Sequence, residues 1–577
     1  MVDDGLRGTV EAWIADDPDA GDQAELRELL ARASGAGAET ELRDRFAGRL
    51  RFGTAGLRGV VAAGPNRMNR AVVRAATAAV AGWLHGPGRS GGTAAGVAVV
   101  VGCDARHRSA EFAEEAARVL AGAGLAVHLL PLPCPTPLLA FAVRHLGTAA
   151  GIMVTASHNP AADNGYKLYL SDGAQVIPPA DREIEARIGA LGALSSIPLA
   201  PAGSPLITRH GDEVAAAYLE GIIDAVGAPG AGDAAGAMDA VDAAPLRVVY
   251  TPMHGVAGSL MLRAFAQAGY PAPHVVAAQA EPDPDFPTVA FPNPEEPGAL
   301  DLALADARSR GADLVLANDP DGDRLAVAVP DPAAAGGWRA LTGDQVGALL
   351  GAAQLRWTAD LGSSRLAATT IVSSTLLSAI AAGAGVSFGE TLTGFKWIAR
   401  AADAVPGAWF VFGYEEALGY AVGDVVRDKD GMSAALAMLR LASEAAAAGQ
   451  SVLSRYDALE SAHGVHLTSQ VTLRTADTSG VMRRLRADPP KEIGGQPVES
   501  ATDLAEGGGT GLPPSDVLIF RLDGVRVVLR PSGTEPKIKC YIEIVEQLGG
   551  HSLAQAREAA ASRLGPLRSA IEALLAG

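Results

Sequence analysis

Stretches of apolar residues alternate with amphipathic stretches along most of the chain. The runs GVAVVVG at 96–102, GIMVTAS at 151–157 and DLVLA at 313–317 lack the alternation of a half-exposed strand. Unbroken apolar runs are typical of strands covered on both faces, and the segments between them have helical periodicity. The pattern predicts three consecutive α/β units with mostly parallel sheets.

The two ends of the chain follow different patterns. The first 50 residues place apolar positions at helical spacing and predict a leader of short helices. Beyond the third unit, four stretches alternate as strands do, at 466–473, 517–522, 525–531 and 537–545. A long helix is predicted from Ser552, so we expect a C-terminal α+β domain.

These patterns divide the chain into four predicted domains, residues 1–205, 206–335, 336–460 and 461–577. The first includes the helical leader. The segment 227–244, rich in Ala, Gly and Asp, has no predicted function, and we interpret it as an exposed insertion.

Composition and charge narrow the class of protein. Of the 577 residues, 48% are hydrophobic and 19% are charged, which predicts globular domains with large cores and excludes general disorder. The formal net charge of −18 disfavours nucleic acid and anionic membranes as partners. An anionic small molecule would therefore have to be bound by local groups of Arg and Lys.

Cysteine usage and the amino terminus indicate a compartment. Cys103, Cys134 and Cys540 lie outside any CxxC spacing, so neither a disulfide framework nor a structural zinc site is predicted. No basic segment followed by an apolar one begins the chain, and no run of about 18 apolar residues occurs. We expect a cytoplasmic protein.

The motif TASHNP, residues 155–160, stands where an apolar strand ends, a usual position for ligand contacts in α/β sheets. It places Ser157 at that edge. A turn or cap role for this serine is the simple alternative, because Ser, His, Asn and Pro are common in turns. No GxSxG motif surrounds it, so acyl-transfer chemistry is disfavoured and phosphoryl chemistry stays open.

The motif NDPDGDR, residues 318–324, directly follows the strand DLVLA. Asp319, Asp321 and Asp323 are spaced so that their carboxylates converge, and they offer the oxygen ligands that Mg²⁺ prefers. An EF-hand is excluded because Arg324 and Pro330 occupy its sixth and twelfth positions. A DxDxT/V phosphatase loop also fits poorly, and a solvated acidic turn remains the alternative.

Two further motifs carry groups suited to a sugar phosphate. GYEEALGY places Glu415 and Glu416 in a loop, and carboxylates accept hydrogen bonds from sugar hydroxyls. RPSGTEPK joins two strands of the last domain and offers cations, hydroxyls and loop amides that suit a phosphate dianion. Its candidate residues are Arg530, Ser532, Gly533, Thr534 and Lys537. A solvated acidic turn and a tight turn with incidental cations are the respective alternatives.

Weaker signals place a cation or a histidine beside glycines. These residues are Arg58, Lys167, His254, Lys396 and Arg427. None of them indicates a function alone, and His254 is equally well explained as a loop histidine.

Taken in order, TASHNP, DPDGDR, GYEEALGY and RPSGTEPK resemble the α-D-phosphohexomutases, the phosphoglucomutase and phosphomannomutase superfamily, over about residues 45–545. The resemblance implies three α/β domains plus a C-terminal α+β domain around a central cleft. It implies that Ser157 is a phosphoserine, that His158 and Asn159 shape its loop, and that Ser157 and the three aspartates hold Mg²⁺.

The same resemblance implies roles for the other candidates. Glu415 and Glu416 would bind sugar hydroxyls, and the RPSGTEPK residues would bind the non-reacting phosphate. The cleft would also be lined by Arg58, Lys167, His254, Arg324, Lys396 and Arg427. Lys167 or Lys396 would be the general acid or base, and the choice between them stays open.

The implied reaction interconverts sugar 1-phosphate and sugar 6-phosphate through a sugar 1,6-bisphosphate, with glucose or mannose as the sugar. One departure concerns the sugar loop, where Ala417 stands in place of the serine of many glucose-type members. A phosphopentomutase is therefore the alternative, followed by a metal-dependent sugar phosphatase or a non-catalytic sugar-phosphate sensor. A monomer or a homodimer is expected.

Overall fold

The computed structural model describes residues 3–33, 36–53, 55–86, 97–227, 246–507, 509, 511–532 and 536–576. The described residues form two compact units. Unit 1 contains those of 1–330 and 421–440, and unit 2 contains those of 331–420 and 441–577.

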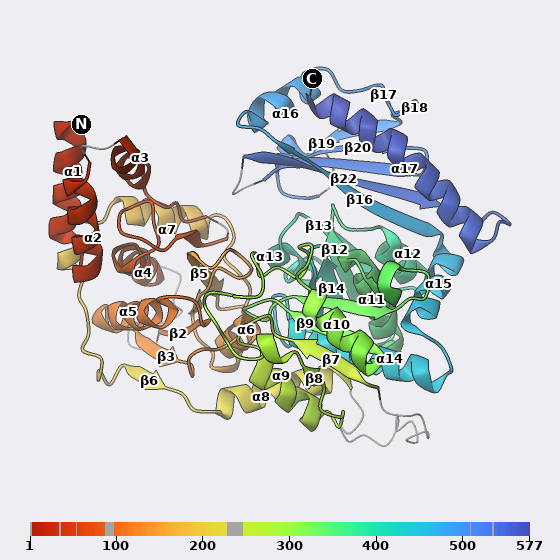
Figure 1. Ribbon diagram of the computed structural model, residues 1–577, viewed down its shortest axis with the longest axis horizontal. Coiled ribbons are helices and arrows are strands. Elements are labelled where there is room, and N and C mark those ends of the chain that lie inside the picture. Colours follow the sequence, from red (N-terminus) through yellow and green to blue (C-terminus); the bar gives the residue numbers. More distant parts are fainter. Residues whose placement is uncertain are drawn as a thin grey trace. The chain divides into compact units, whose positions relative to one another are not determined.

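The first sheet of unit 1 has six strands in the order β1-β5-β4-β2-β3-β6. Strands β2, β3, β5 and β6 of this sheet are labelled in Figure 1. Their bounds, in that order, are Leu57–Val60, Asp163–Leu170, Ala150–Val154, Ala98–Cys103, Ala126–Leu129 and Ile207–Arg209. Its helices are α4 (Arg70–Leu84), α5 (Ser109–Gly122), α6 (Thr136–His145), α7 (Ala180–Gly189) and α8 (Glu213–Val226). Strands β2, β3, β4 and β6 are parallel, whereas β5 runs antiparallel to both β1 and β4.

The second sheet of unit 1 has the order β10-β9-β7-β8. Its strands are Leu325–Pro330, Leu314–Asn318, Val248–Thr251 and His274–Val275 in that order, and its helices are α9 (Gly258–Gln267) and α10 (Asp301–Arg310). Strand β11 (Trp338–Ala340) belongs to unit 2. β7 pairs in parallel with β8 and β9, and β9 pairs antiparallel with β10. The loops after β4 and β9 therefore each join two antiparallel neighbours.

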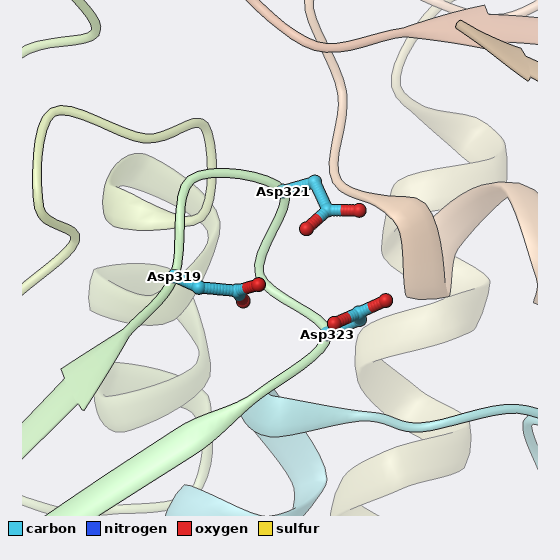
Figure 2. Close-up of side chains that lie close together, drawn as sticks. All are labelled: Asp319, Asp321 and Asp323. Carbon is cyan, nitrogen blue, oxygen red and sulfur yellow. The ribbon is translucent and has the colours of Figure 1, made fainter. Parts of the chain in front are cut away.

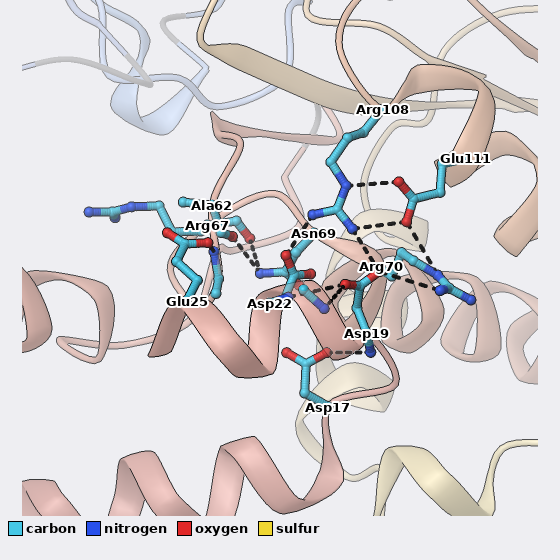
Figure 3. Close-up of polar contacts among 12 residues, drawn as sticks. Asp17, Asp19, Asp22, Glu25, Ala62, Arg67, Asn69, Arg70, Arg108 and Glu111 are labelled. Atoms are coloured by element: carbon cyan, nitrogen blue, oxygen red, sulfur yellow. Dashed lines mark hydrogen bonds and ion pairs between the residues drawn. The ribbon is translucent and has the colours of Figure 1, made fainter. Parts of the chain in front are cut away.

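The leader is helical, as the sequence predicts. It consists of α1 (Asp4–Asp16), α2 (Ala20–Ala31) and α3 (Ala36–Arg45), which share a small apolar core. Asp19 caps α2, and its carboxylate also contacts Arg108, which bonds Asp22 at 2.7 Å (Figure 3). These ion pairs attach the leader to the first sheet's domain.

Unit 2 contains the third sheet, of order β13-β12-β14-β15, with strands Ser387–Thr391, Arg365–Thr370, Trp409–Glu415 and Gly419–Val422. Its helices are α11 (Gly343–Trp357), α12 (Leu376–Gly383), α13 (Phe395–Ile398), α14 (Gly431–Ala447) and α15 (Val452–His463). β12 is parallel to β13 and β14. The unit boundary falls within β15 and within α14.

The C-terminal part of unit 2 is an antiparallel sheet of order β16-β22-β21-β20-β19. Its strands are Val465–Arg474, Lys537–Glu546, Val525–Pro531, Leu518–Leu522 and Ser500–Asp503, and β17 (Glu492–Ile493) pairs with β18 (Gln496–Pro497). Helices α16 (Thr478–Ala487) and α17 (Leu553–Ala576) cover it.

The predicted fold class is confirmed: three α/β sheets are followed by an antiparallel α+β domain. Among the described residues, no helix combines the length and apolar character that a membrane span requires. Most of the segment 227–244 lies outside the described residues, as do Gly533 and Thr534.

Candidate active site

Asp319, Asp321 and Asp323 form the hairpin loop between β9 and β10 and are fully buried. One oxygen from each lies within 4.8 Å of the others, and the three side chains converge (Figure 2). Gly322 makes this turn possible, because it adopts a φ of +73° and a Cβ there would lie 3.0 Å from Ala257. The convergence that the sequence predicts is therefore observed.

The electrostatics of the cluster suit a divalent cation. Burial and the charges of Asp321 and Asp323 raise the pKa of Asp319 well above its usual value. The Oδ1 atoms of Asp321 and Asp323 are buried and accept no hydrogen bond from any described residue. Buried carboxylate oxygens without partners are costly, and a hard cation bound by oxygen ligands would satisfy them.

Ser157 lies just beyond the end of β4 and is 2% exposed. Its Oγ donates a hydrogen bond to Oδ2 of Asp319 at 3.2 Å and lies 3.2 Å from Nδ1 of His158. Burial and the charges of Arg324 and Arg58 hold the pKa of His158 well below its usual value, so this imidazole is neutral. A serine hydroxyl, a neutral histidine and a buried acidic cluster thus meet at one point.

Two lysine ammonium groups face the aspartates. Lys167 on β5 donates to Asp321 at 2.7 Å and to Asp323 at 3.0 Å. Burial alone would lower the pKa of Lys167, but the charges of the two aspartates raise it, so the group is an ammonium. Lys429, in the segment before α14, lies 3.3 Å from Asp323.

Arg58, His254, Arg324 and Arg427 are the other candidates in unit 1. Arg58 on β1 donates to Asn159 at 3.3 Å. The main-chain N–H of Arg324 donates to Asp319 at 2.9 Å, and its guanidinium pairs with Glu295. His254 bonds Thr288 at 2.9 Å, and Arg427 pairs with Asp424 at 3.7 Å.

The sugar-loop glutamates lie in unit 2. Glu415 ends β14 and is 9% exposed, and Glu416 follows it. Burial, followed by the charges of Glu415 and Asp344, raises the pKa of Glu416 to about 7. Ser373 donates a hydrogen bond to Glu416 at 3.3 Å.

The described part of the phosphate motif lies in the same unit. Arg530 is the penultimate residue of β21 and interacts with Tyr541, and the main-chain N–H of Ser532 donates to the carbonyl of Lys537 at 2.8 Å. Burial and the charge of Glu416 raise the pKa of Tyr541, so this side chain is a neutral phenol. Lys396 lies on the short helix α13.

Three residues that the sequence analysis did not single out contact this machinery. Thr136 donates to Asp321 at 2.6 Å, and Arg106 donates to the carbonyl of Ser157 at 2.6 Å. Lys429 is the third. Lys429 lies two residues after the candidate Arg427, and Thr136 follows a proline-rich segment with no distinguishing pattern.

Four family models match in order, all described as phosphoglucomutase/phosphomannomutase: alpha/beta/alpha domains I, II and III at 49–193, 230–335 and 342–461, and the C-terminal domain at 487–559. The chain belongs to this family. The superfamily predicted from the four motifs is confirmed, and with it the enzyme class, an isomerase of the mutase type.

Individual relatives agree with the family. A Haemophilus influenzae protein named "Probable phosphomannomutase" is 41% identical over 82% of the chain and 93% of its own length. A human phosphopentomutase is 34% identical over 94% of the chain and 92% of its own length. The crystal structure of parafusin, a phosphoglucomutase from Paramecium, covers 90% of the chain and 95% of its own length, with a TM-score of 0.65 at 20% identity. This last likeness concerns the fold.

Proposed function

We propose that the protein interconverts sugar 1-phosphate and sugar 6-phosphate, with glucose or mannose as the sugar, through phospho-Ser157. The observation that carries the proposal is the hydrogen bond of 3.2 Å between the Ser157 hydroxyl and Asp319, one of three buried aspartates. A turn role for Ser157 does not account for the contact between its hydroxyl and a carboxylate cluster. A phosphoserine beside a bound cation does account for it.

The proposed metal is Mg²⁺, held by Asp319, Asp321, Asp323 and an oxygen of the Ser157 phosphate. A seryl phosphate carries nearly two negative charges at neutral pH, which three adjacent carboxylates would repel. A bound Mg²⁺ would supply the positive charge that offsets this repulsion and stabilises the transferring group.

The reaction conserves phosphate. A sugar hydroxyl oxygen attacks the phosphorus of phospho-Ser157, the bond from phosphorus to Oγ breaks, and the hydroxyl proton passes to a base. The resulting sugar 1,6-bisphosphate then reorients in the site, so that its other phosphate faces Ser157. Oγ of Ser157 then takes the other phosphoryl group, and the released sugar oxygen regains a proton.

The acid or base is one of the lysines. The charges of Asp321 and Asp323 keep Lys167 protonated, which favours it as the acid that returns a proton to the sugar oxygen. Lys396 remains the other candidate, and replacement of each by Met distinguishes them.

We propose that two sets of residues in unit 2 bind the substrate. Glu415 and Glu416 would bind sugar hydroxyls, and Arg530, Ser532, Gly533, Thr534 and Lys537 would bind the non-reacting phosphate. Arg58, His254, Arg324 and Arg427 would line the remaining surface of the site.

A pentose substrate is the second candidate. Its support is the human phosphopentomutase, which aligns over 94% of the chain. Ala417 adds to this support, since it removes a hydroxyl from the sugar loop. We further propose a cytoplasmic monomer or homodimer, in agreement with the three free, buried cysteines.

The test compares wild type, Ser157→Ala and the surface control Ser309→Ala on glucose 1-phosphate, mannose 1-phosphate and ribose 1-phosphate, with Mg²⁺ and the matching bisphosphate. Isomer formation, free phosphate and phosphorylation of Ser157 are measured together. We expect isomer without free phosphate, lost only in Ser157→Ala. Wild-type turnover in that variant would refute the proposal, and steady phosphate release would identify a phosphatase.

A further inference from the structure

Two buried side chains outside the predicted site hold the loop that carries Ser157. Asp104 and Arg106 follow the end of β2 and are 2% and 4% exposed. The main-chain N–H of Asp104 donates to the carbonyl of Val154 at 3.0 Å, which joins the ends of β2 and β4. Both side chains therefore lie directly beside the serine loop.

Arg106 binds the main chain of that loop. Its Nη2 donates to the carbonyls of Ser157 and Asn159, each at 2.6 Å. Its Nη1 donates to the carbonyls of Pro160 and Asp163 at 2.8 and 3.2 Å. Because the guanidinium is planar and rigid, four carbonyls on one cation fix the backbone from 157 to 163.

Asp104 reaches the serine through Thr155. The Thr155 hydroxyl donates to Asp104 at 2.6 Å and accepts from the main-chain N–H of Ser157 at 2.8 Å. The other oxygen of Asp104 accepts from Ser109 at 2.6 Å and from the N–H of Arg106 at 3.0 Å. A continuous polar chain thus connects a buried carboxylate to the amide of Ser157.

These contacts hold Ser157 in a conformation that a serine rarely adopts. Its φ is +54°, in the left-handed region, and such a backbone persists only where its surroundings enforce it. The loop after β7 offers an internal comparison. There the N–H of Met253, at a φ of +49°, donates to Thr251 at 3.0 Å, and Thr251 donates to the neutral amide of Gln279.

The two loops share one feature and differ in another. A threonine two residues earlier accompanies the left-handed residue in both loops. The buried carboxylate and the arginine that binds four carbonyls belong to the loop with the serine. Ser157 is also the residue whose hydroxyl points at the aspartate cluster.

We propose that Asp104, Arg106 and Thr155 are positioning residues for phosphoryl transfer, fixing Oγ of Ser157 against the aspartate cluster; this rests on the proposed role of Ser157. Their hydrogen bonds are to the main chain of the serine loop, to Ser109 and to one another. Loss of their hold should misplace Oγ while sugar-phosphate binding is retained, so kcat should fall and KM should stay constant.

Thr155 offers the sharpest test. Thr155→Val keeps the shape and removes the hydroxyl, whereas Thr155→Ser keeps the hydroxyl. Thr148→Val is the matched control, because Thr148 is buried near the other end of the same strand and its hydroxyl also makes two hydrogen bonds. Each variant is assayed for kcat, KM and the single-turnover rate at which glucose 1,6-bisphosphate phosphorylates dephosphorylated Ser157.

We expect Thr155→Val to lower kcat and the single-turnover rate by about 30- to 100-fold, with KM changed by less than about twofold. Thr155→Ser should restore both rates to within about threefold of wild type, and Thr148→Val should stay within about twofold. Equal kcat values for Thr155→Val and Thr148→Val would overturn the proposal, as would an effect confined to KM.

Two further arms keep the result decisive. If Thr155→Val does not fold, Arg106→Lys replaces it, because lysine keeps the charge and loses the fork that spans four carbonyls. We expect the same fall in kcat at constant KM, and wild-type kcat in Arg106→Lys would count against the proposal. An inactive Ser157→Ala beside an unaffected Thr155→Val rejects the positioning role alone, whereas an active Ser157→Ala rejects the proposed function itself.

Discussion

A partly buried and a fully buried glutamate of unit 2 should respond in opposite ways to replacement by glutamine. Glu416 lies in the sugar loop, and burial together with the charges of Glu415 and Asp344 raises its pKa from 4.5 to about 7. Glu543 on β22 also loses water contacts, but the hydrogen bond with His466 and the charge of Arg526 lower its pKa from 4.5 to about 2. The amide removes the charge in both cases.

The sign for Glu416 follows from which state loses its proton first. Between pH 4.5 and 7 the unfolded chain ionises before the folded one, so the stability contributed by the neutral carboxyl is full below 4.5 and lost as the pH approaches 7. A shift from 4.5 to about 7 corresponds to at most about 3 kcal/mol. Because the side chain is partly exposed, we expect Glu416→Gln to be more stable than wild type by about 1–3 kcal/mol at pH 8.

Glu543 gives the opposite sign. Its contribution is present above pH 4.5 and is lost as the pH falls toward 2, because the folded state holds the carboxylate. The carboxylate accepts from the N–H of Thr375 at 2.6 Å and pairs with Arg526 at 3.0 Å. Glu543→Gln would remove one of the carboxylates that pair with this buried arginine and leave its ion pair with Glu390 at 2.9 Å, so we expect a loss of about 3–5 kcal/mol at pH 8.

The assay is unfolding at pH 8 and pH 5, followed by calorimetry and tryptophan fluorescence. Glu543→Gln identifies the transition that belongs to unit 2, and Glu558→Gln on the exposed face of α17 controls for the change in net charge. At pH 5 the advantage of Glu416→Gln should shrink below about 1 kcal/mol. If both variants shift stability in the same direction, or if the effect of Glu416→Gln does not depend on pH, the electrostatic reasoning is wrong.

Three more predictions concern unit 1. Asp321→Asn removes one proposed ligand and one partner of Lys167, so we expect the Mg²⁺ concentration for half-maximal activity to rise by about 10- to 100-fold, measured by titration with Mg²⁺. Lys167→Met should lower kcat by at least about 100-fold in initial-rate assays, and a smaller effect than that of Lys396→Met would reverse the preference between them. Arg108→Met breaks the ion pairs with Asp19 and Asp22, and urea unfolding should show a loss of about 1–2 kcal/mol because the arginine is partly buried.

The order of helices and strands could be predicted because buried strands have a recognisable apolar sequence. Strands β2, β4 and β9 have both faces covered and consist almost wholly of apolar residues. The sequence pattern did not predict β5, because its sequence DNGYKLYL contains polar residues that are buried in the structure. Its antiparallel course makes the first sheet mixed rather than uniformly parallel, and it also brings Lys167 opposite Met153 on β4.

The candidate site was predictable where chemistry is carried by side chains in a short loop. Asp319, Asp321 and Asp323 lie within five residues, so their convergence requires only the turn at Gly322. Contacts between residues that are far apart in the chain produce no local sequence pattern. The bond from Thr136 to Asp321 joins residues that are 185 positions apart, and nothing in the local sequence around Thr136 indicates it.

Asp104 and Arg106 were not predicted as site residues, although they also follow the end of a buried strand. The rule that ligand-binding residues follow the carboxyl ends of strands selected Ser157 and Asp319, and it applies equally to the polar residues after GVAVVVG. Applied there, it would have selected Asp104 and Arg106 as polar side chains at the same sheet edge. It would not have indicated their role, because Arg106 binds main-chain carbonyls, which every residue carries and no pattern distinguishes. A residue that positions a catalytic loop through its backbone therefore needs a structure to be recognised, whereas the serine that it positions does not.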